Sequence, residues 1–290
     1  MKTILEKIFT GSTMIVFLCF LTVMSCSDDT DFGEQYKKTI YIVNSNSLLY
    51  TGEHYFEKEN DEIVISVYCA SSEPIGSDLK VRLKVHRDAL DSLNTISELA
   101  DPSYISKLML PKANYQMEGE LYTTIKAGRQ YGTLNIPFDF TGLDPDYDYA
   151  LPISLVSNSA DYDINPDVKS IVYEIKMINE YSGSFAGSSS EETTSRISSV
   201  QPALKAMSVN TVRMPIHNLD DDIQLLDTNF MLLTIAEDGS VTISPWANAL
   251  VTDLGESTYD FVRQRYELNY EYNGIPISEI ITNIDAPQTE

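Results

Sequence analysis

The sequence of 290 residues predicts an all-β fold, and three features of its pattern support this prediction. Apolar and polar residues alternate at period two in short runs, most clearly in Leu79–Val85 and Leu134–Phe140. Asp238-Gly239 and Asn273-Gly274 each follow such a run, and these dipeptides favour the tight turn of a β-hairpin. A helical pattern occurs in one short passage. We therefore expect antiparallel sheets with a single short helix.

The composition is that of a folded and strongly acidic protein. The chain has 43 acidic and 20 basic residues, a net charge of −23, and 43% hydrophobic residues. The apolar residues are spread along the whole length, whereas a disordered acidic tail has few of them. Binding to a phosphate backbone needs clustered positive charge, so this charge balance excludes nucleic acid as a partner.

Residues 1–25 are predicted to be a signal peptide. Lys2 and Lys7 precede an apolar run from Met14 to Met24. The run is shorter than the roughly 20 residues that a transmembrane helix needs, and its length suits the central region of a signal peptide. These residues are therefore excluded from the predicted fold.

The end of this segment resembles a bacterial lipoprotein signal. Val23-Met24-Ser25-Cys26 is similar to the lipobox, which implies that Cys26 carries lipid and anchors the protein in a membrane. Ser27-Asp28-Asp29-Thr30-Asp31 resembles the acidic export signal of Bacteroidetes lipoproteins, which implies an outer-membrane location facing the cell exterior. The alternatives are an ordinary signal peptide that contains a cysteine, and an anchor that faces the periplasm. Residues 26–38 are expected to form a tether.

A first β-domain is predicted over residues 39–179. Its helix is expected at Asp88–Leu99, where apolar residues recur at three-residue spacing after a candidate cap at Asp88. Pro137 cannot donate a ladder hydrogen bond, so its strand is expected at a sheet edge or beside a bulge. Cys69 continues the inward face of an alternating strand and is expected to be a buried, inert thiol.

A second β-domain is predicted over residues 180–290. The chain changes character at Tyr181–Gly187 and in the polar stretch that follows, and strand patterns then resume. From Tyr266 to Tyr272, tyrosine and leucine occupy one face of the run, and glutamate and asparagine occupy the other. A strand with one buried and one solvent-exposed face is typical of an antiparallel sandwich or barrel.

These motifs together resemble a class of Bacteroidetes surface lipoproteins from polysaccharide-utilisation loci, which consist of two modules of unknown function. The first module is similar to the one at the front of certain endo-β-N-acetylglucosaminidases. That likeness rests on Leu79–Val85 followed by the helix to Asn94, on Leu110-Pro111 with Tyr115, and on the motifs Thr124-Ile125-Lys126-Ala127-Gly128 and Tyr149-Ala150-Leu151-Pro152-Ile153. The second module is similar to the domain that usually follows it. This likeness rests on Tyr181, Gly183, Phe185 and the tyrosines from Tyr259 to Tyr272.

The resemblance implies an N-terminal immunoglobulin-like β-sandwich with one short helix, followed by a C-terminal antiparallel β-barrel or calycin-like domain. The chain departs from the family pattern at Thr95–Lys107, where the connection after the helix is longer. The family supplies no catalytic residue.

Sequence motifs for catalysis are absent. His54, His86 and His217 are isolated, so each is expected at the surface or in packing rather than as a ligand. A glycosidase needs a pair of carboxylates, and no pair stands out among the many acidic residues. We therefore predict no enzyme activity, no catalytic residue and no cofactor.

Three aspartates, Asp144, Asp146 and Asp148, alternate as at the start of a calcium loop. The segment lacks the glycine and the final glutamate of that loop, which favours an ordinary acidic turn. No metal site is therefore predicted, and weak calcium binding is the alternative.

Sugar binding combines aromatic faces with carboxylates and amides that hydrogen-bond to hydroxyl groups. Trp246, the single tryptophan, follows a strand in a loop with Pro245, and Trp246 and Tyr259 are the candidate carbohydrate contacts. One basic stripe is formed by Lys80, Arg82, Lys84 and His86. It is expected to pair with acidic residues of a neighbouring strand, and binding of an anionic sugar is the alternative.

These observations lead to one functional hypothesis and one alternative. The chain is predicted to be a non-catalytic cell-surface lipoprotein of a glycan-uptake system, which binds polysaccharide or supports components of the outer-membrane transporter. The alternative is a structural or adhesion lipoprotein that contacts another protein.

Overall fold

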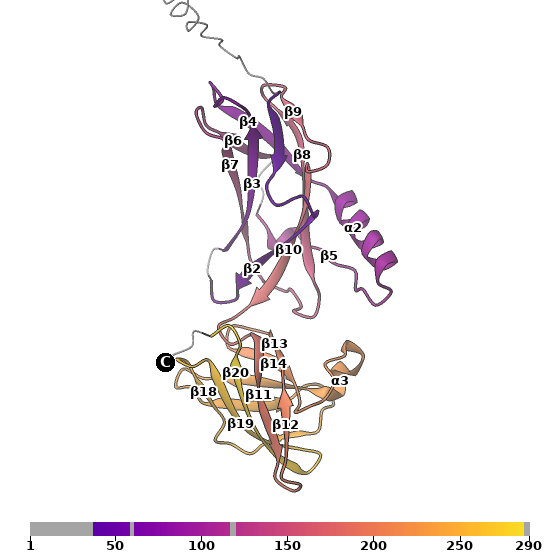
Figure 1. Ribbon diagram of the computed structural model, residues 1–290, viewed down its shortest axis with the longest axis vertical. Helices are drawn as coiled ribbons and strands as arrows, with labels where there is room; N and C mark the ends of the chain where they lie inside the picture. Colours follow the sequence, from indigo (N-terminus) through magenta and orange to yellow (C-terminus); the bar gives the residue numbers. More distant parts are fainter. Residues whose placement is uncertain (1–36, 59–60, 117–119, 287–290) are drawn as a thin grey trace, which may run out of the picture.

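The computed structural model describes residues 37–58, 61–116 and 120–286. Nearly all regular structure in this part of the chain is β-strand, arranged in two lobes along the long axis (Figure 1). The predicted all-β class is therefore confirmed. The predicted signal peptide, the lipid on Cys26 and residues 26–36 of the predicted tether lie outside the described residues. No helix in the described ranges is long and apolar enough to cross a membrane.

The N-terminal lobe is a sandwich of two sheets. The first sheet contains, in spatial order, β7 (Tyr131–Phe138), β3 (Asp61–Ala70), β1 (Thr39–Ile42) and β9 (Asp163–Ile164). The second contains β2 (Leu49–Tyr55), β10 (Ser170–Ile178), β8 (Tyr149–Asn158), β4 (Leu79–Val85) and β6 (Leu121–Ile125), with β5 (Leu108–Met109) beside β8. A short 3₁₀ helix, η1 (Lys112–Asn114), precedes β6. The predicted sandwich is therefore present.

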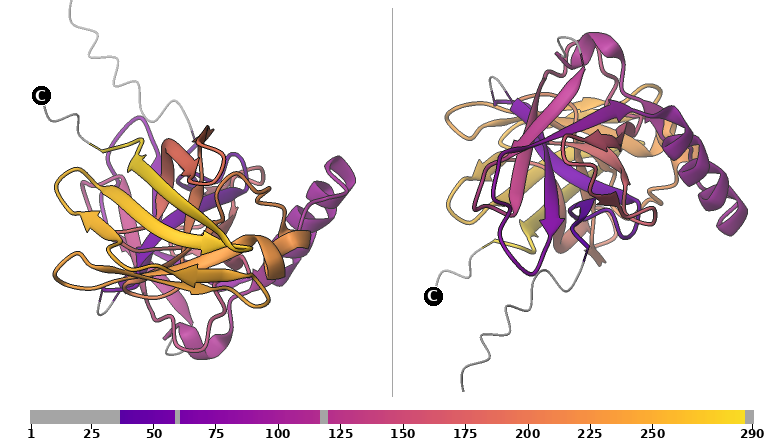
Figure 2. Two further views of the ribbon diagram at one scale, coloured as in Figure 1. Left: turned by 90° about the horizontal axis from the view of Figure 1, so that it is seen from below. Right: turned by 90° about the horizontal axis from the view of Figure 1, so that it is seen from above.

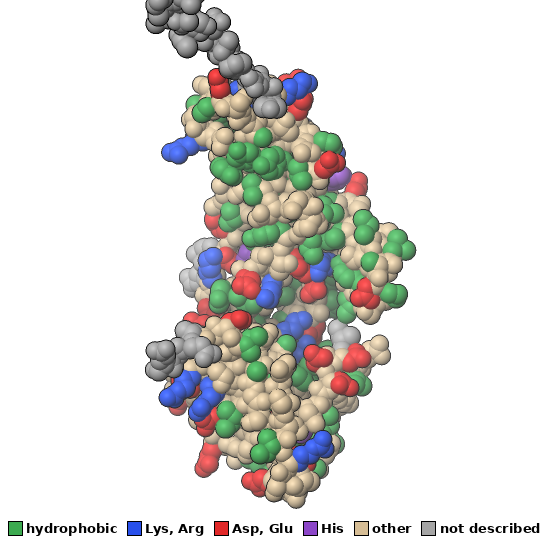
Figure 3. All heavy atoms as spheres, in the orientation of Figure 1, with side chains coloured by type: hydrophobic (Ala, Val, Ile, Leu, Met, Phe, Trp, Pro, Cys, Tyr) green, Lys and Arg blue, Asp and Glu red, His purple; other side chains and the backbone are tan. Residues whose placement is uncertain are grey.

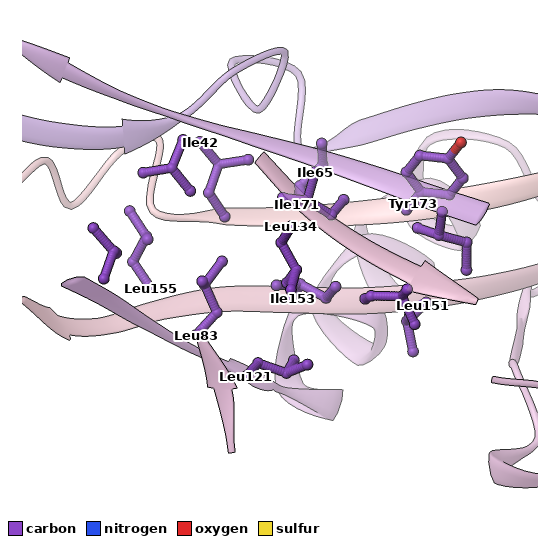
Figure 4. Close-up of a cluster of buried hydrophobic side chains, with 14 of the residues drawn as sticks. Ile42, Ile65, Leu83, Leu121, Leu134, Leu151, Ile153, Leu155, Ile171 and Tyr173 are labelled. Carbon is purple, nitrogen blue, oxygen red and sulfur yellow. The ribbon is translucent and has the colours of Figure 1, made fainter. Parts of the chain in front are cut away.

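The core of the sandwich lies between these sheets. Alternate residues of β3 face inward, and Ile63, Ile65, Val67 and Cys69 are at most 1% exposed. Figure 4 shows Ile65 and Leu134 of the first sheet approaching Ile153 and Leu151 of the second. Burying one such side chain contributes roughly 1.5–3 kcal/mol, so this interface dominates the stability of the lobe. The prediction of a buried Cys69 is confirmed.

Two sequence features of this lobe can be compared directly with the structure. Pro137 lies in β7, which is an edge strand of its sheet, as predicted. Helix α2 (Arg87–Ala100) forms at the predicted place and packs Leu90 against Val172. The prediction of an Asp88 cap is wrong, because His86 is the capping residue and Asp88 lies in the first turn, where its charge favours the helix dipole. Helix α2 projects to the side of the sheets (Figure 2).

The C-terminal lobe is one strongly curved antiparallel sheet that is nearly closed into a barrel, as predicted. In spatial order its strands are β16 (Val241–Pro245), β15 (Phe230–Ile235), β14 (Thr211–Pro215), β13 (Ala203–Ala206), β11 (Gly183–Glu191), β20 (Ile275–Asn283), β19 (Arg265–Tyr272) and β17 (Val251–Asp253). Two further strands pair at its sides, β12 (Arg196–Val200) with β11 and β18 (Thr258–Asp260) with β19. Helices η2 (Ile223–Leu225) and α3 (Leu226–Asn229) connect β14 to β15.

Local sequence explains how the barrel folds. Both predicted hairpins are present, and Asn273 and Gly274 have the positive φ angles of 51° and 80° that their turn between β19 and β20 requires. Tyr266 and Tyr270 face inward and are fully buried. At Gly187 a side chain would meet the Ile280 carbonyl oxygen at 1.8 Å, so only glycine allows β11 and β20 to approach there.

Candidate ligand-binding groove between the two lobes

A groove with a volume of about 1140 Å³ lies where the sandwich meets the barrel. On the sandwich side it is lined by the ends of β2 and β10 and by the loop between β7 and β8. On the barrel side it is lined by β13 and by the loops that follow β18 and β20. Charged side chains gather around the junction of the lobes (Figure 3). The groove therefore depends on both lobes.

Two tyrosines are exposed on the sandwich wall. Tyr55 ends β2 and is 44% exposed, and Tyr147 lies in the β7–β8 loop and is 48% exposed. The loop is held as a tight turn, because an Asp144 carboxylate oxygen accepts a hydrogen bond from the backbone N–H of Asp146 at 2.9 Å. The predicted acidic turn thus presents an aromatic side chain to the groove.

The barrel wall carries one exposed aromatic ring and two side-chain amides. Phe261 follows β18 and is 46% exposed, and its ring meets the buried Tyr259 ring edge-on at 5.3 Å between centroids. Gln264 and Asn283, which carry side-chain amides, are part of the lining, and the backbone N–H of Asn283 donates to the Gln264 carbonyl oxygen at 3.0 Å. Aromatic faces beside amides are the groups that recognise sugars.

Ion pairs fix much of the sandwich wall. Lys176 and Glu53 are neighbours across β10 and β2, with 2.8 Å between Nζ and Oε1. The buried Lys107 binds Glu174 and lies 3.5 Å from Asp148. Burial lowers the pKa of Lys107, but the hydrogen bond and charges of its two acidic partners outweigh it and raise the pKa overall, so the side chain stays charged.

A charged latch joins the lobes directly beside the groove. The Arg213 guanidinium of β14 donates to both carboxylate oxygens of Asp146, at 2.8 Å and 2.5 Å. The Arg213 side chain is only 5% exposed and packs over the rings of Trp246 and Phe230, at 4.6 Å and 5.5 Å from their centroids. Burial raises the pKa of Asp146, but its bonds to Arg213 outweigh burial and lower the pKa overall. The pair is therefore charged and bidentate.

The covalent connection between the lobes is short and hydrogen-bonded. β10 ends at Ile178 and β11 begins at Gly183. Between them, the buried Asn179 amide donates to the carbonyl oxygens of Ser208 and Thr211, at 2.7 Å and 3.1 Å. This connection and the Asp146–Arg213 latch together fix one wall of the groove against the other.

The structure places the two candidate carbohydrate contacts in different surroundings. Tyr259 lines the groove but is only 5% exposed, and burial raises the pKa of its hydroxyl to about 12. Trp246 does not line the groove and is half-buried on Arg213. The exposed aromatic side chains of the groove, Tyr55, Tyr147 and Phe261, were not singled out by sequence, because nothing in a strand pattern shows which loops meet.

The three histidines lie apart from the groove lining. His54 is buried and bonded to Asp61, with 2.6 Å between Nδ1 and Oδ2, and burial lowers the pKa of His54. His217 is buried in the barrel, and the half-exposed His86 lies 3.0 Å from Asp88. Within the described part of the chain, no three His, Cys, Asp or Glu side chains gather closely enough to hold a metal ion.

Two members of the basic stripe, Arg82 and Lys80, make contacts within the sandwich. Arg82 pairs with Glu120, just before β6, with 3.1 Å between Nη1 and Oε1. Lys80 lies over the Tyr122 ring, 3.8 Å from its centroid. The expected pairing with an acidic residue beside a neighbouring strand is confirmed for Arg82.

The barrel interior contains a polar cluster that sequence reasoning missed. Glu279 of β20 is fully buried, and its Oε2 accepts a hydrogen bond from the Tyr270 hydroxyl at 2.7 Å. Ser189 lies 3.5 Å from the same oxygen and 2.6 Å from Nδ1 of His217. Burial raises the pKa of Glu279 to about 7, whereas burial lowers the pKa of His217. At neutral pH the cluster therefore holds a carboxyl group that is close to its titration midpoint.

Comparison with known families agrees with this architecture. A family model of an N-terminal domain matches residues 36–161, and a companion model of a C-terminal domain matches residues 169–286. The chain belongs to this two-domain family. The family resemblance predicted from the sequence motifs is thus confirmed. No curated protein matches the sequence significantly.

Solved structures of Bacteroides proteins share the fold of this two-domain family. A multidomain protein including DUF1735 from Bacteroides ovatus matches with a TM-score of 0.60 and 16% identity, over 86% of this chain and 93% of its own. A protein of unknown function from the same species matches with a TM-score of 0.58 and 17% identity, over 83% of this chain and 89% of its own. An auxiliary nutrient binding protein from Bacteroides thetaiotaomicron matches with a TM-score of 0.53 and 16% identity, over 83% of this chain and 91% of its own. These TM-scores show a common fold.

Proposed function

We propose that the protein is a non-catalytic, lipid-anchored surface protein of a glycan-uptake system, and that the groove between the lobes binds polysaccharide. The observation that carries this proposal is the lining of the groove, where exposed aromatic side chains from both lobes lie among amides and carboxylates. Pyranose rings stack on aromatic faces, and their hydroxyl groups hydrogen-bond to such polar groups. The solved neighbour described as an auxiliary nutrient binding protein supports the same role.

Removal of an exposed ring from either wall is expected to weaken this binding. Tyr147→Ala and Phe261→Ala should each weaken affinity at least about tenfold, since aromatic anchors dominate such sites. The measurement is affinity electrophoresis of residues 27–290 against a polysaccharide panel.

Tyr131→Ala is the matched control, because Tyr131 is 60% exposed and lies outside the groove. Equal retardation of all three variants and the unmodified protein would place binding elsewhere. The absence of retardation on every glycan would favour the role of supporting the transporter complex.

The proposed anchor is tested at Cys26. Replacement Cys26→Ala is expected to abolish metabolic labelling with fatty acid and to release the protein from the membrane fraction. Cys69→Ala is the control, because Cys69 is buried and should leave labelling unchanged. Retained label in the Cys26→Ala protein would refute the anchor. Protease treatment of intact cells then separates an exterior location from a periplasmic one.

An adhesion or scaffold role is the second candidate. The observation that favours it is the outer face of α2, where Ile96 is 63% exposed and Leu99 is 82% exposed. Exposed apolar side chains on a projecting element are typical of contacts between proteins. Co-purification of a stable protein partner, with no affinity for any glycan, would favour this role.

A further inference from the structure

We infer that the groove is selective for neutral glycans and excludes chains that carry carboxylate or sulfate groups. This inference rests on the proposed glycan-binding function and adds the class of ligand. It follows from three properties of the lining: how its cations are paired, where its free carboxylates lie, and which groups remain to meet a sugar.

Each cation of the groove already lies beside a carboxylate of the protein. Among its described lining residues, Lys176 and Lys205 are the two that carry positive charge. Nζ of Lys176 lies 2.8 Å from Glu53, and Nζ of Lys205 lies 3.7 Å from Asp146. An anionic sugar would compete with these carboxylates for either cation, and recognition of a sulfate or uronate needs an available cation.

The carboxylates of the groove outnumber the cations. The lining contains the acidic side chains of Glu53, Asp148, Glu174, Glu180 and Asp285. Two of these, Glu180 and Asp285, are exposed, and no cation of the described chain lies within ion-pair distance of either. Two like charges about 4 Å apart repel by roughly 1 to 4 kcal/mol in water or at a protein surface. An anionic ligand therefore meets repulsion from these two carboxylates.

The same carboxylates suit a neutral sugar. An ionised carboxylate only accepts hydrogen bonds, and a neutral sugar offers several hydroxyl donors. The amides of Gln264 and Asn283 can both donate and accept, and Tyr55, Tyr147 and Phe261 provide apolar faces. A neutral polysaccharide can therefore hydrogen-bond to the carboxylates and amides of the groove and stack on its aromatic rings.

Matched polysaccharide pairs test this inference in affinity electrophoresis of residues 27–290. Two pairs match a neutral with an anionic probe: galactan with polygalacturonate, and dextran with dextran sulfate. Mannan and xylan are further neutral probes, and all are run at low and at physiological ionic strength. We expect at least one neutral probe to retard the protein, with at least tenfold weaker binding in Tyr147→Ala, and no anionic probe to do so. A second protein, Glu180→Lys with Asp285→Lys, should gain retardation on an anionic probe at low ionic strength. Glu73→Lys with Glu256→Lys, outside the groove, is its charge-matched control and should gain none.

The outcomes separate the inference from the function on which it rests. Retardation by an anionic probe that disappears in Tyr147→Ala would overturn the neutral class and leave glycan binding in the groove intact. Retardation by no probe at all would overturn glycan binding and this inference with it. Continued exclusion of every anionic probe by the double lysine variant would overturn the role given to the lining charges.

Discussion

Replacement of Arg213 by alanine is expected to lower the free energy of unfolding of the barrel by about 3 kcal/mol, because removal of one partner from a buried ion pair leaves the other without compensation. Asp146 would keep Lys205, 3.7 Å away, as its cationic partner, and the rings of Trp246 and Phe230 would lose the guanidinium that packs over them. Trp246 is the single tryptophan of the chain, so its fluorescence reports unfolding of this region in urea.

Arg263→Ala is the control for this experiment. Arg263 also pairs with an aspartate, Asp260 at 3.0 Å, but its side chain is 62% exposed. Solvent screens an exposed pair, so its removal should scarcely shift the urea midpoint. Equal midpoints for the Arg213→Ala and Arg263→Ala proteins would contradict the interpretation of the Asp146–Arg213 contact as a buried latch.

Replacement of Glu279 by glutamine is expected to stabilise the barrel above neutral pH and to flatten its pH dependence. The pKa of Glu279 is about 7 in the fold, against 4.5 as its ordinary value. Because the folded-state pKa is raised, the stability linked to this group is complete below pH 4.5 and is lost as the pH rises through about 7. The loss amounts to about 3 kcal/mol at pH 8, and glutamine, which does not ionise, avoids it.

The groups around Glu279 define how this effect is measured. Tyr270 of β19 and Ser189 of β11 contact the carboxyl group. His217, after β14, contacts Ser189 and lies 3.5 Å from Glu191. The pKa of His217 is lowered by burial, so its own contribution is lost as the pH falls, opposite in sign to that of Glu279. Urea unfolding from pH 4.5 to 8.5 separates the two effects.

Glu271→Gln serves as the matched control, because Glu271 lies on the outward face of β19. We expect its pH profile to follow that of the unmodified protein. An unchanged profile for Glu279→Gln would mean that the carboxyl group ionises in the fold at its ordinary pKa, and that the barrel interior solvates it.

The sequence predicted those parts of the fold that depend on local pattern. The face of Tyr266 and Tyr270, the hairpin at Asn273-Gly274 and the edge position of Pro137 all follow from period-two alternation and backbone chemistry, and each is observed. The prediction of Asp88 as the cap was wrong, because the observed cap, His86, lies two residues before the position that the spacing of apolar residues indicated. A helix boundary depends on the packing of the preceding strand, which spacing does not encode.

The groove could be predicted only in part. Aromatic residues and carboxylates were expected to bind sugar, but Tyr147 and Phe261 are separated by more than a hundred positions and meet through the docking of two lobes. Arg213 looked like an ordinary strand residue, because a partner such as Asp146 cannot be paired with it from one sequence. Glu279 did leave a signal, since it interrupts the inward row of Ile277 and Ile281 with a charge.

The four residues between β10 and β11 have a further consequence for any ligand that touches both lobes. They hold the second wall of the groove close to the first. A ligand bound to one wall therefore contacts the other wall in an intramolecular step, at a high effective concentration. The loss of translational freedom then occurs once for two sets of contacts. Affinity should accordingly rise steeply with oligosaccharide length until both walls are spanned, and should level off beyond that length.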